Sequence, residues 1–315
     1  MNNLPFDKPG RFWKGNLHCH SNLTDGALSP ADVCRTYAEN GYDFISLTDH
    51  FLAVYDYPLV DTRPYRTERF TTILGAELHH GQTEHGVMWH ILANGLPLDF
   101  APPAEAETVA DFVERAIDAG AFVSIAHPQW YTLTVADALS LGDRVHAIEV
   151  YNTTCDETDT GAGSYMLDLL LARGKWYNAI ATDDAHFRPG RNDGLQNFVM
   201  VKAEANEPEA LLAALKAGYF YASQGPLIHD IQVAPGDKVV LRTSPISTAI
   251  LRNTSPKRPS PGMSVAGGSC SVRQIGNGMT EVELPLESVT GDWARLIVKD
   301  HFGRRAWSNP FKLEA

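Results

Sequence analysis

Short apolar runs alternate with helical patterns along most of the chain before residue 228. The runs are rich in β-branched and aromatic residues, which is typical of buried strands. Ser29 and Pro30 open one helix and Gly41 follows its end, because Ser caps a helix, Pro suits its first turn and Gly its C-terminal end. The alternation predicts an α/β fold with a largely parallel sheet and crossover helices. The predicted strands are 44–47, 71–76, 87–93, 121–126, 147–151, 178–182 and 198–201, and the further helices are 105–119, 166–172 and 208–216.

The pattern changes after about Ile228, where strand-like runs are separated by Gly, Pro, Ser and Asn. Asn277-Gly278 and residues 301–303 are typical of hairpin turns, and residues 253–264 form a loop rich in Pro, Ser and Gly. We therefore predict two domains, an α/β domain of residues 1–228 and a small all-β, sandwich-like domain of residues 229–315. The strands predicted for the second domain are 238–242, 249–252, 271–274, 280–285, 295–298 and 311–313.

Residues of a metal-binding type lie at or near the ends of the predicted strands. His18 and His20 are two positions apart, so in an extended chain both face one side while Cys19 faces the other. Barrels and open α/β sheets build their sites at the C-terminal ends of their strands. The candidate metal ligands are His18, His20, Asp25, His50, Glu77, His90, His127, Asp184 and His186.

Each candidate alone also has an ordinary structural explanation, such as a buried imidazole bonded to a carbonyl group or, for Asp184, a helix cap. Together they favour a metal site, because burying many imidazoles and carboxylates is costly unless they are paired or coordinate cations. All are nitrogen and oxygen donors, a set that suits Zn, Mn, Fe or Co rather than a metal selected by thiolates. A polynuclear metal centre is the simplest interpretation.

Composition and charge restrict the classes of partner. The chain has 315 residues, of which 44% are hydrophobic and 20% charged, as in ordinary globular proteins. The net charge of -12 disfavours long nucleic acids and acidic membranes, but not a small phosphorylated substrate, because bound cations reverse the local potential. The four cysteines are scattered, and neither a secretory signal nor a membrane-spanning run is evident, so we expect a cytoplasmic protein with reduced thiols. The oligomeric state is left open.

Five groups of motifs follow one another along the chain: His18-x-His20 with Asp25-Gly26, Thr48-Asp49-His50, Gly75-Ala76-Glu77, Ala126-His127-Pro128 and Asp184-Ala185-His186. Their order resembles that of the PHP (polymerase and histidinol phosphatase) family over roughly residues 14 to 225. The resemblance implies a distorted (β/α)7 barrel with a trinuclear metal centre at the C-terminal ends of its strands. Within the family, residues 217–226 and 148–152 resemble the carbaryl-hydrolase-like (CehA/McbA-type) branch.

The resemblance also implies how the ligands divide among three divalent ions. The first set would be His18, His20, Glu77 and Asp184, the second Glu77, His90 and His127 with Glu77 bridging, and the third Asp25, His50 and His186. The family's spacing between the Glu and the His at position 90 varies, so His79, His80 and His85 remain alternatives to His90.

The function expected from this centre is metal-dependent hydrolysis by an activated hydroxide. A small phosphate ester is the favoured substrate, because three cations match a dianionic group. Alternatives are hydrolysis of a carbamate, carboxylic ester or amide by the same centre, and a non-catalytic metal- or sugar-binding protein.

Four residues are candidates for roles in the reaction. Arg188 and Arg191 follow the last motif and would clamp phosphate oxygens, or else belong to a solvated basic loop. Asp49 would orient a ligand histidine, and His186 would also serve as general acid.

Overall fold

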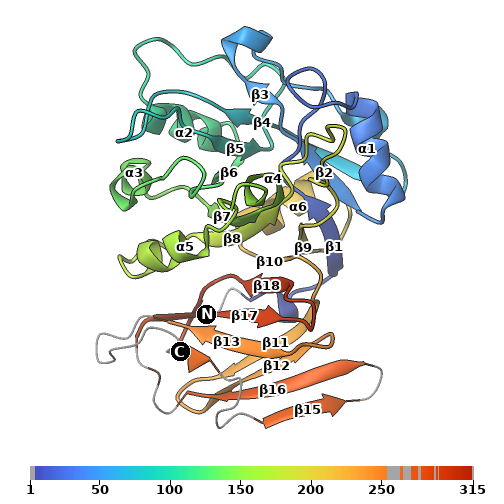
Figure 1. The fold of residues 1–315 in the computed structure, drawn as a ribbon, viewed down its shortest axis with the longest axis vertical. Helices are drawn as coiled ribbons and strands as arrows, with labels where there is room; N and C mark the ends of the chain where they lie inside the picture. The colour runs from blue at the N-terminus through green and yellow to red at the C-terminus, as the bar shows by residue number, and fades with distance from the viewer. Residues whose placement is uncertain are drawn as a thin grey trace.

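The computed structural model describes residues 4–253, 263–264, 271–275, 278–286, 289 and 291–313. An α/β part occupies the upper half of Figure 1 and a β-rich part the lower half. Most of the predicted loop 253–264, and Asn277 of the predicted hairpin turn, lie outside the described residues.

One long sheet forms the frame of the α/β part. Its strands here are β1 (Arg11–Asn16), β2 (Phe44–Leu47), β4 (Thr71–Leu78), β5 (Ile91–Asn94), β6 (Phe122–Ile125), β7 (Ala147–Asn152), β8 (Asn178–Thr182), β9 (Phe198–Ala203) and β10 (Phe220–Ser223). The prediction of parallel pairing is confirmed for β1, β2 and β4 and for β6, β7 and β8. It is wrong for β5, which is antiparallel to β4 and β6, and for β9, which is antiparallel to β1 and β10.

The connection before β5 explains its reversed direction. A parallel connection needs a crossover, usually a helix, whereas residues 79–90 contain no helix. They fold back instead, and the Thr83 amide donates to the Val87 carbonyl at 2.8 Å. The strand predicted over 87–93 therefore begins only at Ile91, and His90 immediately precedes it.

The helices begin where side chains cap them. Ser29 accepts a hydrogen bond from the Asp32 amide, as predicted, whereas Thr108 forms a capping box with Asp111 and starts the second helix later than the predicted residue 105. Both segments end near a glycine of positive φ, and Gly120 lies at +101°. The helices are α1 (Pro30–Glu39), α2 (Val109–Asp118), α3 (Val135–Ser140), α4 (Thr153–Asp156), α5 (Ser164–Leu171) and α6 (Pro208–Lys216), and the short elements are β3 (His50–Phe51), η1 (Pro5–Asp7), η2 (Ala53–Tyr55) and η3 (Arg63–Tyr65).

The sheet curls so that Cα atoms of β8 lie within 8 Å of Cα atoms of β9 and β10. Among the described residues, neither β9 nor β10 pairs with β8 through backbone hydrogen bonds, so the barrel is nearly closed but not continuous. Side chains from strands around the sheet meet in one buried cluster, which includes Phe44, Leu92, Phe122, Ile180 and Phe220. Each such side chain contributes about 1.5–3 kcal/mol of hydrophobic stabilisation, so the strand ends are held on a rigid base.

The C-terminal part is built of strands, as predicted. The main sheet continues from β10 through β18, β17 and β13 to β14, and a second sheet has the order β11-β12-β16-β15. The strands are β11 (Ile228–Ala234), β12 (Lys238–Thr243), β13 (Thr248–Arg252), β14 (Met263–Ser264), β15 (Ser271–Ile275), β16 (Met279–Pro285), β17 (Trp293–Lys299), β18 (Arg305–Ser308) and β19 (Phe311–Lys312). Residues 301–303 form the predicted turn between β17 and β18. The division at residue 228 stays a prediction. No helix of the described residues is both long and apolar enough to cross a bilayer.

A buried ion-pair network joins α5 to the C-terminal strands. Asp168 accepts hydrogen bonds from Arg252 of β13 at 3.0 and 2.6 Å and from Arg295 of β17 at 2.8 Å. Because Arg295 is almost completely buried, its guanidinium depends on this carboxylate for charge compensation.

We expect Asp168→Ala to lower the free energy of unfolding by about 3–5 kcal/mol, because it leaves a buried guanidinium unpaired. Chemical denaturation measures the change. Asp118→Ala, which removes an exposed partner of Arg144, should cost less than about 1 kcal/mol. Equal small losses in the two variants would contradict the role given to Asp168.

Candidate metal centre

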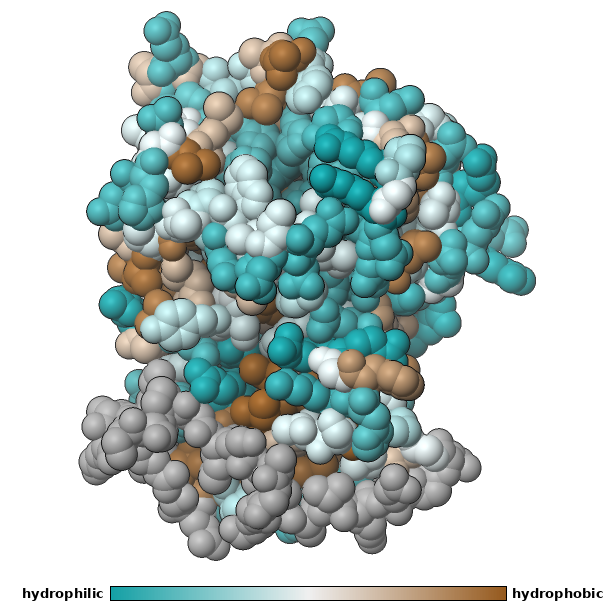
Figure 2. Space-filling view, viewed as in Figure 1, coloured by the Kyte–Doolittle hydropathy of each residue, from teal (hydrophilic) through white to brown (hydrophobic). Residues whose placement is uncertain are grey.

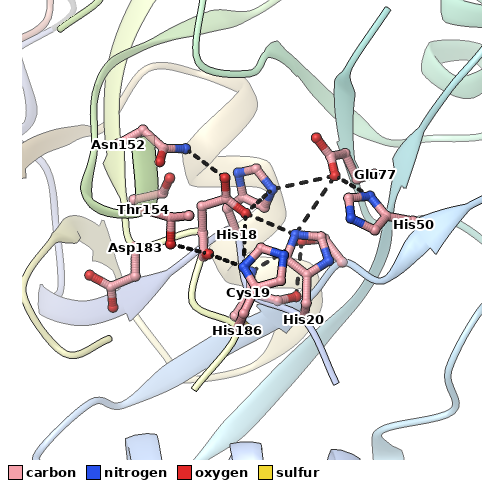
Figure 3. Close-up of polar contacts among 12 residues, drawn as sticks. His18, Cys19, His20, His50, Glu77, Asn152, Thr154, Asp183 and His186 are labelled. Carbon is pink, nitrogen blue, oxygen red and sulfur yellow. Dashed lines mark hydrogen bonds and ion pairs between the residues drawn. The ribbon is translucent and has the colours of Figure 1, made fainter. Parts of the chain in front are cut away.

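Histidines and carboxylates from distant parts of the chain converge at the C-terminal ends of the strands (Figure 3). His18 and His20 follow β1, Glu77 lies near the end of β4 and Asp184 follows β8. All four side chains are buried. Cys19 points away into the apolar cluster that contains α1, as strand alternation predicted.

The Nε2 atoms of His18 and His20 each face one oxygen of Asp184 and one of Glu77. Asp184 Oδ1 lies 2.9 Å from His20 Nε2 and 3.1 Å from His18 Nε2, and Glu77 Oε2 lies 3.7 Å from both nitrogens. Tetrahedral coordination at about 2.0–2.2 Å separates ligand atoms by about 3.3–3.6 Å. The observed spacings bracket that value, so the first implied ligand set fits a metal ion.

The other carboxylate oxygen of Glu77 organises a second group. Glu77 Oε1 lies 2.8 Å from His90 Nδ1 and 3.3 Å from His127 Nε2. His127 Nε2 also lies 4.0 Å from Asp184 Oδ2. Glu77 thus faces two donor sets, one with each oxygen, which is the arrangement that a bridging ligand requires.

Asp25 organises a third group toward the surface. Its Oδ1 lies 3.3 Å from His50 Nε2 and 3.2 Å from His186 Nε2. A donor atom of His20 completes a group in which all ligand atoms lie within 4.8 Å of one another. The structure therefore brings together all nine of the predicted metal ligands.

Several of these buried atoms have no conventional hydrogen-bond partner among the described residues. Such orphaned atoms are rare in folded proteins unless water, an ion or a ligand satisfies them. Among the candidate ligands these atoms are His18 Nε2, His20 Nδ1, Asp25 Oδ1, Glu77 Oε2 and His127 Nδ1. Divalent cations would satisfy His18 Nε2, Asp25 Oδ1 and Glu77 Oε2, because these three atoms face the ligand sets described above. His20 and His127 direct Nε2 rather than Nδ1 toward the carboxylates.

The carboxylates of the centre are held in their ionised form. Burial by itself would raise the pKa of Glu77, but the neighbouring His90, His50 and other imidazoles lower it well below its ordinary value. Burial likewise opposes ionisation of Asp184, and His18 and His20 outweigh it and lower the pKa of that carboxyl group. The site thus keeps negative charge available for cations.

The imidazoles fall into two groups. Burial lowers the pKa of His20 to about 3 and that of His90 to about 4, so both are neutral near pH 7 and can offer a lone pair. Burial also disfavours the charged form of His50, but Glu77 and Asp25 raise its pKa to about 10. A metal ion at the third set would take the place of that proton.

Glu149 is a buried partner of the centre that we did not assign from the sequence. Its Oε1 accepts a hydrogen bond from His18 Nδ1 at 2.8 Å, and its Oε2 accepts from the His127 amide at 2.6 Å. The first bond fixes the His18 tautomer and leaves Nε2 free to bind a metal. The sequence feature that could have indicated this role is a glutamate inside the apolar run of β7, where an unpaired carboxylate would be costly.

His79 is a second residue whose place the sequence left open. Its Nδ1 donates to the Trp89 carbonyl at 3.1 Å, so its Nε2 accepts from His50 Nδ1 at 2.9 Å. Glu77 Oε2 lies 3.4 Å from the same His79 nitrogen. Of the other two alternatives to His90, His80 bonds the Glu107 carbonyl and His85 is exposed, so neither reaches the centre.

The residues predicted to act on the substrate occupy different positions. Asp49 orients no histidine ring; it accepts from the amide and hydroxyl of Ser21 at 2.7 and 2.6 Å and from Thr24 at 2.6 Å, and so holds the loop between His20 and Asp25. Arg188 donates to the Asp25 carbonyl group at 2.8 Å and to its carboxylate at 2.7 Å. Arg191 lies outside the centre and pairs with Glu157 at 3.5 Å.

Comparison with known proteins identifies the fold. No protein-family profile matches the sequence, and no curated protein matches it. Among solved structures, the chain is similar to a two-domain protein from Bacteroides vulgatus ATCC 8482 that contains a predicted PHP-like metal-dependent phosphoesterase. The TM-score is 0.54 at 17% identity, and the match covers 94% of each chain.

Two further solved structures resemble only part of the chain. One is an amidohydrolase from Chromobacterium violaceum with bound sulfate and no metal (TM-score 0.42, 17% identity, 56% of this chain and 88% of that one). The other is a candidate metal-dependent phosphoesterase from Bifidobacterium adolescentis (TM-score 0.42, 14% identity, 57% of this chain and 90% of that one). The likeness to the Bacteroides protein shows a shared mixed α/β fold with a β-rich C-terminal part, and at this identity it extends to the fold alone.

We expect Glu149→Gln to weaken metal binding by about 10–100-fold, because an amide nitrogen would replace one acceptor oxygen beside His18 or His127. Calorimetric titration of metal-stripped protein with Zn²⁺ or Mn²⁺ measures the affinity. Glu157→Gln, an exposed substitution, serves as the matched control. Unchanged affinity in Glu149→Gln would remove this residue from the metal centre.

Proposed function

We propose that the protein is a metal-dependent hydrolase of a small phosphate ester, with a centre for three divalent ions such as Zn, Mn or Fe. The observation that carries the proposal is the division of nine ligands into three carboxylate-centred sets at one end of the sheet, with Glu77 shared by two of them. Three divalent cations would outweigh the charge of the three ligand carboxylates, so the loaded centre would attract a phosphate dianion.

We further propose membership of the PHP family, in its carbaryl-hydrolase-like branch, with a hydrolase domain of residues 1–228 and a β domain of residues 229–315. The ordered ligand motifs and the shared fold with a PHP-like protein support this. A cytoplasmic location belongs to the same proposal. Among the described residues, Cys19, Cys34 and Cys155 are buried free thiols, which supports a reducing environment.

The exposure of the ligands indicates the side from which a substrate would approach. The side chains of His18 and His20 are 0% exposed, whereas those of Asp25 and His50 are 29% and 15% exposed. Ions held by the three sets would supply a hydroxide nucleophile and neutralise charge on the phosphate oxygens. The chain itself shields the deep ligands from water and leaves the Asp25 side for the ester.

Arg188 is the proposed phosphate contact. Its guanidinium is anchored on the partly exposed Asp25, so its charge is already positioned beside the third ligand set. Arg191 is directed to Glu157 and has no such anchor.

His186 is assigned here as a ligand rather than as the general acid. Its Nδ1 donates to the Asp184 carbonyl at 2.8 Å, and its Nε2 faces Asp25. Both ring nitrogens are therefore engaged, and none is left to protonate a leaving group.

Metal removal tests the class of reaction. Chelator-treated protein should lose hydrolysis of p-nitrophenyl phosphate and regain it with Mn²⁺ or Zn²⁺. Turnover of a naphthyl carbamate, measured in parallel, should be slower. Metal-dependent turnover of the carbamate alone would move the assignment to ester or amide hydrolysis, and turnover of neither by metal-loaded protein would contradict a hydrolase of these classes.

Removing ligands tests the centre itself. His18→Ala and Asp184→Ala should each lower the bound metal, measured by elemental analysis, and reduce phosphatase activity by at least about hundredfold. His85→Ala replaces an exposed histidine outside the centre and should leave both unchanged. Full metal content in the two ligand variants would refute their ligand role.

A further inference from the structure

A second cavity lies away from the metal centre, between the β7–α5 region and the β13–β17–β18 face. Its volume is about 500 Å³, within the range of pockets for small molecules. None of the candidate metal ligands lines it. In Figure 2 the junction between the upper part and the grey atoms shows apolar atoms with hydrophilic atoms on both sides.

Strand register places alternating rows of side chains on one wall of this cavity. Ile250, Ile297 and Trp307 are neighbours across β13, β17 and β18 and form an apolar row. On one side of this row Arg252 faces Arg295, and on the other side Lys299 faces Arg305. An apolar strip therefore runs between two pairs of cationic side chains.

Like charges directly opposite each other destabilise a sheet unless something compensates them. Asp168 compensates the first pair, because it accepts hydrogen bonds from both Arg252 and Arg295. Lys299 and Arg305 have no carboxylate within ion-pair distance among the described residues. A cationic pair in a cavity of a chain with net charge -12 is available for an anion.

The other walls add flat apolar surface. Tyr151 stacks on Trp307 with ring centroids 6.0 Å apart, and Tyr165 at the rim is 71% exposed. Two buried donors in the walls, Arg295 Nη1 and Trp307 Nε1, have no acceptor among the described residues. Unsatisfied buried donors are uncommon, so their occurrence together points to acceptor atoms supplied from outside the chain.

We propose that this cavity binds a small organic anion with a flat, apolar body. The anionic group pairs with Lys299 and Arg305, and the body lies along Ile297 beside the stacked pair of Tyr151 and Trp307. This site is separate from the metal centre and does not depend on the proposed hydrolase function.

The test uses two fluorescent probes that share the same rings, with the full-length, metal-loaded protein. The anionic probe is 8-anilinonaphthalene-1-sulfonate, and the neutral probe, N-phenyl-1-naphthylamine, lacks only the sulfonate group. Fluorescence titration should show saturable binding of the anionic probe, at least about tenfold tighter than that of the neutral one.

Lys299→Gln/Arg305→Gln should weaken binding of the anionic probe by at least about tenfold and leave the neutral probe unaffected. The matched control Lys312→Gln/Arg173→Gln removes the same two charges from exposed positions and should change neither affinity. Unchanged binding of the anionic probe in the cavity variant, or an equal loss in the control, would overturn the proposal.

Thermal stability provides a second readout. Without probe, the cavity variant should melt at the same temperature as the wild type or higher, because the substitution relieves repulsion between like charges. Metal content should stay constant. A lower melting temperature would mean that the two cations stabilise the fold, and would contradict the binding role given to them.

Discussion

One buried carboxylate, that of Glu77, has six histidines within 3.7 Å of its oxygens. An ionised carboxylate without solvent is costly, and so are several imidazoles that compete for the same oxygens. The conflict is resolved if divalent cations lie between them, because each cation satisfies a carboxylate oxygen and several nitrogen lone pairs together. The convergence of strand ends around Glu77 is thus the constraint on which the rest of the centre depends.

An outer layer of hydrogen bonds holds this convergence in place. Glu149 fixes His18, and His79 bonds His50. Asp183, next to Asp184, accepts from the amides of residues 195–197 and from the Tyr37 hydroxyl, which anchors the segment after β8. Asp184 itself has a positive φ of 54°, a strained conformation that aims its carboxylate into the centre. Local backbone strain is therefore the free-energy cost of orienting the Asp184 carboxylate.

Much of this arrangement could be predicted from local sequence signals. The bounds of β2 and β8 agree with the apolar runs, and the ends of α6 agree with its proline and glycine, because burial and capping act over a few residues. The predicted ligands meet in space because they lie at or near strand ends on one side of the sheet or, for Asp25, in the loop that follows β1. Strand ends on one sheet are brought together by topology, whichever side chain occupies them.

Other features depend on contacts that local patterns do not encode. The direction of β5 follows from how residues 79–90 fold back, and the partner of His18 comes from a glutamate far away in the chain. The cationic rows of the second cavity arise only from the register of β13, β17 and β18. Tertiary packing sets such pairings, so they cannot be predicted from an isolated Arg or Glu in the sequence.

The most direct measurement is anomalous X-ray diffraction at the absorption edge of the metal, from crystals of protein saturated with Mn²⁺ or Zn²⁺. We expect three anomalous peaks at this end of the sheet. One lies among His18, His20, Glu77 and Asp184, one among Glu77, His90 and His127, and one among Asp25, His50 and His186. A saturated crystal with no peak beside Glu77 would contradict the assignment of these residues as metal ligands.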